Sequence, residues 1–212
     1  MSVKTDVQGF DISKNSAVVI GCGGLGTNAA VHLAGAGVGR LLLVDYDTVE
    51  QRNLNRQFFY TGEDIGRPKC SLLAERLSAY APDCGIECLE KKVSEFSFAD
   101  GYDVIVAAVD NIETRRAVSD WCVKNKKPCV NGSINGFFGT AYLYIPGKTP
   151  DLEKAGCLNE TGVKNRSPSV TAGIIGALEA KLAVDLFLGD FDSAGKLYIL
   201  DGNEIRMLCV KE

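Results

Sequence analysis

The stretch VVIGCGGLGTNAAVHLAGAGV, residues 18–38, places glycines between an apolar β-branched run and an alanine-rich segment. Gly21, Gly23 and Gly26 have the spacing G-x-G-x-x-G, which predicts a strand, a tight turn and the start of a helix. Bare amides of such a turn, together with the helix dipole, can face phosphate oxygens. The stretch predicts a nucleotide-binding unit, with NAD, FAD or ATP as ligand. A tight turn without any ligand is the structural alternative.

Apolar runs and helical segments alternate on both sides of this turn. The runs at 17–21, 40–45, 85–93, 102–110 and 127–132 are typical of buried parallel strands. Helices are expected between them at about 25–38, 66–80 and 112–125. This order predicts an α/β fold, a doubly wound, Rossmann-like and mostly parallel sheet with helices on both faces.

The pattern changes after residue 132. The alternating run FFGTAYLYIPG, 137–147, predicts an antiparallel strand, followed by a loop over about 146–168 and a long helix that ends near Gly189. Asp201 and Gly202 separate two β-like runs and indicate a C-terminal hairpin. We therefore expect antiparallel C-terminal strands within a single domain, 1–212, with a nucleotide-binding part over about 15–132 and a second part over about 133–212.

Composition narrows the class of protein. The chain has 212 residues, 46% hydrophobic and 24% charged, with a formal net charge of −4. Lys and Arg are scattered, which argues against a general nucleic-acid binder. No apolar run approaches the roughly 20 residues of a membrane span, and the N-terminus lacks the apolar core of a secretory signal. These features predict a cytoplasmic protein with neither nucleic acid nor membrane as partner.

The eight cysteines do not have the spacing of a metal site. None forms a C-x-x-C pair, so no structural zinc is expected. Several lie in apolar runs, where a thiol behaves as a small hydrophobic group. Most of them are therefore expected to fill the core.

The residues after the second strand decide between nucleotides. Asp45 stands 21 residues beyond Gly24, where an acidic side chain commonly receives ribose hydroxyls, and this alone favours an NAD-dependent dehydrogenase. A dense polar and basic group then follows, made of Arg52, Asn53, Asn55, Arg56, Arg67 and Lys69. Fixed cations suit the charge that grows when pyrophosphate leaves, so a triphosphate fits better. A solvated basic face is the alternative.

The ordered motifs GCGGLG, LLLVDYDTVEQRNLNRQ, IGRPK and AAVDNIETR resemble those of the ThiF/MoeB/HesA family, whose fold is shared with the adenylation domains of ubiquitin-activating enzymes. The likeness covers most of the chain and is closest in type to ThiF. The resemblance implies that Asp45 binds the ribose, that Arg56 and Lys69 bind the phosphates, and that Asn53 supports them. It also places Gly24, Asp47 and Asn111 at the nucleotide.

Asp110 is implied to hold Mg²⁺ beside ATP. It ends a buried run, at the carboxyl edge where open α/β sheets place their ligand crevice, so the reading from the residues agrees. The alternative role for Asp110 is to cap the helix that starts near residue 112. Arg56, Lys69 and Asp110 are the expected catalytic residues.

The family chemistry implied is an ATP-dependent adenylyltransferase. The terminal glycine carboxylate of a ubiquitin-like sulfur carrier with a Gly-Gly tail, similar to ThiS or MoaD, attacks the α-phosphorus of ATP and gives an acyl-adenylate and pyrophosphate. This is a step toward a thiocarboxylate, with thiamine biosynthesis among several possible pathways. Two alternatives remain, the same adenylation on a tRNA nucleoside or a peptide, and a non-catalytic nucleotide-binding protein. A homodimer and a sulfur-donor protein are further implied partners.

Three features depart from larger members of that family. The two C-x-x-C pairs are missing, which indicates a short, zinc-free form. No Arg precedes Arg40, so the Arg that family dimers lend to the partner's site is replaced by Lys4 or Lys14, or each site is complete in one subunit, or activity is lost. Cys157 lies in the loop where some relatives carry a reactive cysteine, but several residues upstream of the expected place. It is a candidate catalytic residue if its thiol is exposed and has a lowered pKa, and a plain loop or partly buried thiol is the alternative.

The resemblance also implies a docking surface for the carrier in the second part of the chain. Phe137 and Phe138, in the run NGFFGTAYLY, are the candidates for it. Burial within the sheet is the favoured alternative for both.

Overall fold

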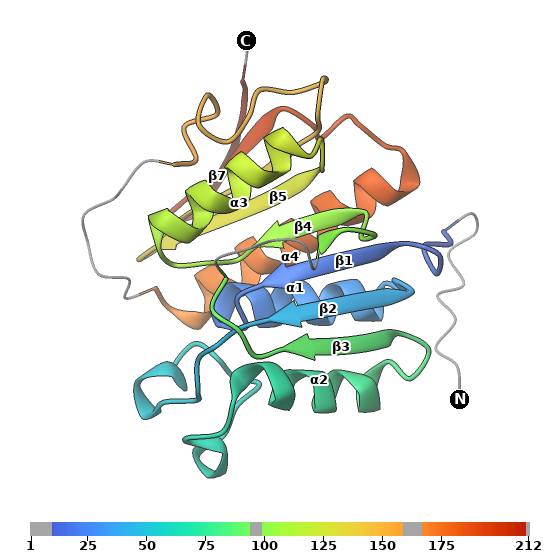
Figure 1. The fold of residues 1–212 in the computed structure, drawn as a ribbon. Helices are drawn as coiled ribbons and strands as arrows, with labels where there is room; N and C mark the ends of the chain where they lie inside the picture. The colour runs from blue at the N-terminus through green and yellow to red at the C-terminus, as the bar shows by residue number, and fades with distance from the viewer. Residues whose placement is uncertain (1–9, 94–98, 159–166, 211–212) are drawn as a thin grey trace.

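The computed structural model describes residues 10–93, 99–158 and 167–210, which build one eight-stranded sheet in the order β3-β2-β1-β4-β5-β6-β7-β8 (Figure 1). The strands are β1 Ser16–Ile20, β2 Arg40–Val44, β3 Gly85–Leu89, β4 Val104–Ala107, β5 Cys129–Asn135, β6 Phe138–Tyr144, β7 Lys196–Asp201 and β8 Glu204–Cys209. The helices are α1 Gly24–Gly35, α2 Lys69–Tyr80, α3 Ile112–Lys124 and α4 Ser169–Leu188, with short 3₁₀ turns at Gln51–Asn53 and Gly62–Asp64.

The sheet is parallel from β3 through β5 and antiparallel from β5 through β8. The order reverses at β1, where β2 lies on one side and β4 on the other, so the carboxyl ends of β1 and β4 flank a crevice. Every residue of β1 and β4 is buried, as expected for central parallel strands. The predicted doubly wound α/β fold with antiparallel C-terminal strands is confirmed.

Helices cover both faces of the sheet (Figure 1). One face packs α1, α2 and α4 in a core that includes Val19 of β1, whereas Val18 points to the other face and joins a core with α3. Helices α1 and α4 cross closely, because a Cβ on Gly176 would lie 2.6 Å from the carbonyl oxygen of Leu25. The glycine in α4 thus lets this helix lie directly against the one that follows the glycine turn.

Several element boundaries differ from the sequence expectation. Strand β3 ends at Leu89 and β4 at Ala107, before the predicted ends at 93 and 110. Residues 90–92 are charged, whereas the amide of Ala108 still donates to the carbonyl of Ile20 at 3.0 Å. The helix expected from residue 66 begins at Lys69, after Pro68 as its N-cap.

Four exposed side chains bear on the expected burial. Phe137 and Phe138, favoured as buried, are 64% and 40% exposed, because Phe137 lies in the turn between β5 and β6 and Phe138 is the first residue of β6. Six cysteines are buried as expected, but Cys88 and Cys209 are exposed, because they lie on the two outermost strands of the sheet.

Candidate active site

A tight glycine turn forms the floor of the site. Gly21 has φ +95°, and a Cβ there would lie 2.6 Å from the carbonyl oxygen of Ala108. A Cβ on Gly26 would lie 1.7 Å from the carbonyl oxygen of Gly21, so only glycine fits. Helix α1 starts at Gly24 with no side-chain cap, so the amides of its first turn are unoccupied by a capping group. This end of α1 suits an anion.

A cleft of about 1270 Å³ runs along the carboxyl edge of the parallel strands. It brings together segments that are far apart in the sequence, namely the glycine turn, the loop after β2, the start of α2 and the loop between β4 and α3. All predicted nucleotide-site residues except Gly26 line it: Gly21, Gly23, Gly24, Asp45, Asp47, Asn53, Arg56, Lys69, Asp110 and Asn111. Gly26 lies beneath the turn, where it permits the close approach.

Asp45 connects the glycine turn to the end of β2. Its carboxylate accepts hydrogen bonds from the amide of Cys22 at 2.6 Å and from the amide of Asp47 at 2.8 Å. Burial raises the pKa of Asp45, while these two bonds and Lys69 oppose that rise. The carboxylate is therefore held by backbone at the rim of the cleft, where a ribose hydroxyl can reach it.

Lys69 begins α2 and has almost no exposed surface, with 6% of its side chain accessible. Its ammonium lies 3.0 Å from the carboxylate of Asp47, which is half-exposed. The backbone joins the same two residues, because the amide of Lys69 donates to the carbonyl of Asp47 at 3.0 Å. Lys69 is thus a fixed cation at the cleft, paired with an acidic side chain that water can solvate when the pair opens.

The loop after β2 packs against the start of α1. A Cβ on Gly24 would lie 3.3 Å from the carbonyl oxygen of Arg56, and one on Gly23 would lie 3.4 Å from Nε2 of Gln57. The guanidinium of Arg56 donates to Oδ1 of Asn55 at 3.1 Å. Buried oxygens of Asn53 and Gln57 have no hydrogen-bond partner within the described chain. Buried acceptors without partners beside a glycine turn are groups that a ligand or water would satisfy.

Asp110 and Asn111 have different roles, and the structure separates them. Asn111 is the N-cap of α3, because its side chain accepts from the amide of Thr114 at 2.8 Å. The alternative of Asp110 as the cap is therefore wrong. Within residues 10–93, 99–158 and 167–210, the exposed carboxylate of Asp110 makes no hydrogen bond or ion pair, so it is open to a ligand in the cleft.

Cys157 does not meet the condition set for a reactive thiol. It is buried, in contact with the core on the α3 face, and burial raises its pKa to about 12. Arg115 opposes this rise without reversing it. The turn over 151–157 folds Cys157 inward, which residue spacing could not reveal.

Arg115 and Gln57 line the cleft and were assigned no role from the sequence, although both fall within or beside the quoted motifs. Arg115 is buried and donates to the carbonyl of Val109 at 2.8 Å. Its position five residues after Asp110, as the fourth residue of α3, is the signal that could have identified it. Lys91 and Lys92 add exposed positive charge at the end of β3.

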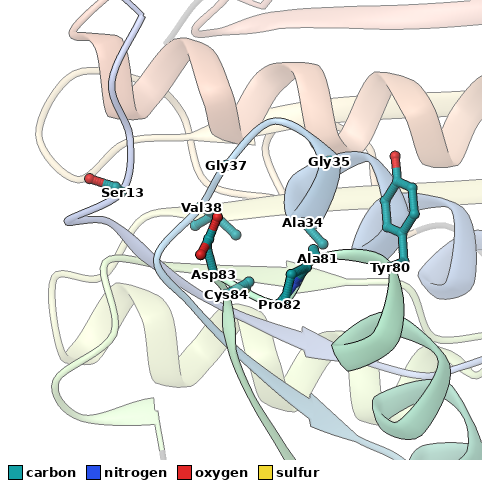
Figure 2. A pocket seen from close by; sticks show the side chains of 10 residues that line it. All are labelled: Ser13, Ala34, Gly35, Gly37, Val38, Tyr80, Ala81, Pro82, Asp83 and Cys84. Carbon is teal, nitrogen blue, oxygen red and sulfur yellow. The ribbon is translucent and has the colours of Figure 1, made fainter. Parts of the chain in front are cut away.

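A second cavity, about 80 Å³, lies at the opposite edge of the sheet between the ends of α1 and α2 (Figure 2). Its walls include Ala34, Val38, Tyr80 and Pro82.

Among the described residues, no three His, Cys, Asp or Glu side chains gather as metal ligands, and no helix has the length and apolar character to cross a membrane.

Comparison with known proteins shows that this doubly wound sheet and its cleft are those of an adenylyltransferase of the ThiF and MoeB type. The chain belongs to the ThiF family, whose model matches residues 5–212. It is 35% identical over 201 residues to the sulfur carrier protein ThiS adenylyltransferase of Escherichia coli (strain K12), covering 89% of this chain and 78% of that protein.

Other relatives are longer than this chain. It is 38% identical over 209 residues to the adenylyltransferase and sulfurtransferase MOCS3 of Drosophila grimshawi, covering 91% of this chain but 46% of that protein. Among solved structures, E. coli MccB with ATP matches with a TM-score of 0.81 at 23% identity, over 93% of this chain and 63% of that one. At that identity the likeness concerns the fold.

Proposed function

We propose that this chain adenylates the C-terminal glycine carboxylate of a ubiquitin-like sulfur carrier at the expense of ATP. The observation that carries the proposal is that the glycine turn, Arg56, Lys69 and Asp110 lie along one cleft. The names of the ThiS adenylyltransferase and MOCS3 relatives support the choice of acceptor. The proposal extends to this chain what those names say of the relatives.

The nucleotide would lie across the cleft with its phosphates at the start of α1. The amides of the glycine turn would face phosphate oxygens, and Asp45 would accept hydrogen bonds from the ribose hydroxyls. Lys69 would exchange Asp47 for a phosphate, because a triphosphate carries more charge than one solvated carboxylate. Arg56, next to the first turn of α1, would add the second cation.

Asp110 fits a magnesium ion on the donor chemistry of this structure. Its carboxylate is exposed toward the cleft and unpaired within the described residues, and Mg²⁺ is commonly held by one or two carboxylates together with substrate phosphates. The ion would supply neutralisation of the phosphate charge. Asp110 would hold it, and Lys69 and Arg56 would neutralise the remaining phosphate oxygens.

The transfer step needs no nucleophile from the protein. A carboxylate oxygen of the carrier's terminal glycine forms a bond to the α-phosphorus, and the bond from that phosphorus to the bridging oxygen breaks. Pyrophosphate leaves with the bonding electrons, and an acyl-adenylate remains. The protein contributes position and fixed positive charge, which account for most of the rate enhancement in phosphoryl transfer.

The exposed phenylalanines support a docking surface for the carrier's globular part. Ser133 and Ile134 of β5 line the cleft, and the turn that follows presents Phe137 and Phe138 to solvent. A flexible tail of the carrier could then enter the cleft while its body contacts this turn. Val170 and Ile174, exposed at the start of α4, are proposed as part of a homodimer interface.

The deciding experiment is ATP–pyrophosphate exchange with Mg²⁺, with and without carrier proteins that end in Gly-Gly. Asp110→Ala is expected to abolish carrier-dependent exchange, whereas Asp120→Ala, an exposed aspartate of α3 outside the cleft, is expected to leave it unchanged. If the protein binds ATP but none of the carriers supports exchange, the acceptor is a different one, such as a peptide. NAD binding without ATP binding would contradict the proposal.

A further inference from the structure

A buried tyrosine outside the quoted nucleotide motifs connects the two halves of the site. Tyr60 follows the loop after β2 and is 3% exposed, with its ring packed among Val49, Leu72 and Leu54. Its hydroxyl donates to the carbonyl of Cys22 at 2.8 Å and lies 3.3 Å from the carbonyl of Lys69. One hydroxyl therefore touches both the glycine turn and the first residue of α2.

These contacts close a ring of hydrogen bonds. Tyr60 bonds Cys22, whose amide donates to Asp45. Asp45 accepts from the amide of Asp47, and Asp47 pairs with Lys69, whose carbonyl returns to Tyr60. Asp45, Asp47 and Lys69 belong to the proposed ribose and phosphate site, and Cys22 lies in the glycine turn between Gly21 and Gly23. Tyr60 alone closes it from beneath.

Peptide geometry gives the Tyr60 bond a direction. The peptide unit between Cys22 and Gly23 is planar and trans, so its carbonyl and its N–H point in opposite directions. The carbonyl of Cys22 points down to Tyr60, and Gly23 lines the cleft above. Within the described chain, the amide of Gly23 donates to no acceptor, so it is available to a phosphate oxygen. A hydrogen bond at the carbonyl also polarises the N–H of the same unit.

The hydroxyl has no other function that the surroundings require. Burial raises the pKa of Tyr60, so the hydroxyl keeps its proton and remains a donor. A phenylalanine would fill the same space against Val49 and Leu72, so packing alone asks for the ring and not for the oxygen. Within the described residues, the oxygen makes the hydrogen bond to Cys22 and the longer contact with Lys69, both at the site.

We propose that Tyr60 is a positioning residue for phosphate binding. Through the carbonyl of Cys22 it aims the amide of Gly23 into the cleft, and through Lys69 it holds the glycine turn in register with the phosphate-binding lysine. This inference rests on the proposed function, because it names a residue that prepares the same ATP site.

The test compares two buried tyrosines that each lose one hydroxyl. Tyr142 is fully buried and donates to the carbonyl of Pro150 at 2.8 Å, outside the cleft. Tyr60→Phe and Tyr142→Phe are expected to lower the thermal unfolding midpoint by similar amounts. Only Tyr60→Phe is expected to weaken ATP binding, by about two- to tenfold in calorimetry, the range that one net hydrogen bond provides.

Three outcomes separate the inference from the function. Equal ATP affinity of Tyr60→Phe and wild type, or equal losses in both variants, would overturn the positioning role while the adenylation proposal stands. Absence of ATP binding by the wild-type protein would remove the proposed function itself. A second readout is the ¹⁵N amide resonance of Gly23, which is expected to shift in Tyr60→Phe and not in Tyr142→Phe. An unchanged Gly23 resonance would contradict the peptide-orientation argument.

Discussion

The parallel sheet has two edges, one formed by the amino ends of its strands and one by their carboxyl ends, and their polar groups are used differently. At the amino edge, polar groups are consumed: the amide of Ser16 donates to Asp103 at 2.8 Å, and the amide of Gly85 donates to the carbonyl of Gly39 at 2.9 Å. What remains open there is the cavity of about 80 Å³ (Figure 2). At the carboxyl edge, the cleft is about 1270 Å³, and the carboxylate of Asp110 and the buried oxygens of Asn53 and Gln57 have no partner among the residues that the structure describes.

The difference follows from the direction of the chain. Helices α1 and α3 start at the carboxyl edge, so their free amides and positive dipole ends gather there. Helix ends with surplus carbonyls meet at the amino edge, where short turns bond to one another. One edge is therefore sealed and contributes stability, whereas the other is left unsatisfied and can bind an anion.

Replacing one lysine at each edge gives the largest expected contrast. Lys69→Met keeps the length of the side chain but removes the cation beside the glycine turn, and ATP–pyrophosphate exchange is expected to fall by about 10²- to 10³-fold. Lys127→Met, which removes the bond from Lys127 to the carbonyl of Tyr102 at the amino edge, is expected to leave exchange within about twofold. Similar exchange rates in the two variants would contradict the division of the edges.

Glu179 is a polar side chain in the core whose hydrogen-bonding groups are also unsatisfied. It is fully buried on α4, its carboxylate oxygens have no geometrically satisfactory partner within the described chain, and burial raises its pKa well above the ordinary value. Arg115 of α3 and the amide of Gly132 oppose the rise.

Because its folded-state pKa is raised, Glu179 keeps a proton that the unfolded chain has released, and stability falls as pH rises above the ordinary glutamate pKa. Glu179→Gln is therefore expected to add about 1 to 3 kcal/mol to the free energy of unfolding at pH 8, and less at pH 5. Urea unfolding at both pH values measures this. A gain that is equal at the two values would mean that Glu179 does not titrate as stated.

A substitution of Asp103 tests whether the amino edge contributes to stability and not to ATP binding. Asp103→Ala removes the acceptor of the Ser16 amide and hydroxyl, both at 2.8 Å, and is expected to lower the free energy of unfolding by about 1 to 2 kcal/mol. The affinity for ATP is expected to stay unchanged. A changed affinity with unchanged stability would reverse the assigned roles of the edges.

The smallest effect is expected at Cys157. Its thiol is buried, with a pKa of about 12, so Cys157→Ala is expected to change exchange by less than about twofold. Iodoacetamide at pH 8 is expected to label the exposed Cys88 and Cys209 before Cys157, as peptide mass spectrometry would detect. Preferential labelling of Cys157 would show that the loop opens.

The layers of the fold were predictable because local patterns determine them. The apolar runs around the glycine turn indicated which segments form parallel strands. Asp45 and Asp110 follow two of these runs, so their place at the carboxyl edge of the sheet could be predicted. Features set by long-range contacts were not predictable. Whether Asp110 or Asn111 caps α3, whether Cys157 faces inward, and how Tyr60 reaches Cys22 depend on neighbours that are distant in sequence.

Because the glycine turn is so tight, its glycines are expected to persist in related proteins even where catalysis has been lost. Gly21 and Gly26 are required by the close approach of backbone to backbone, whether or not a nucleotide ever binds. A descendant that lost catalysis would keep these glycines for as long as it folded, while drift could erase Lys69 and Asp110 first. In a related sequence the glycines therefore indicate a shared fold, whereas Lys69 and Asp110 indicate whether the protein is still active.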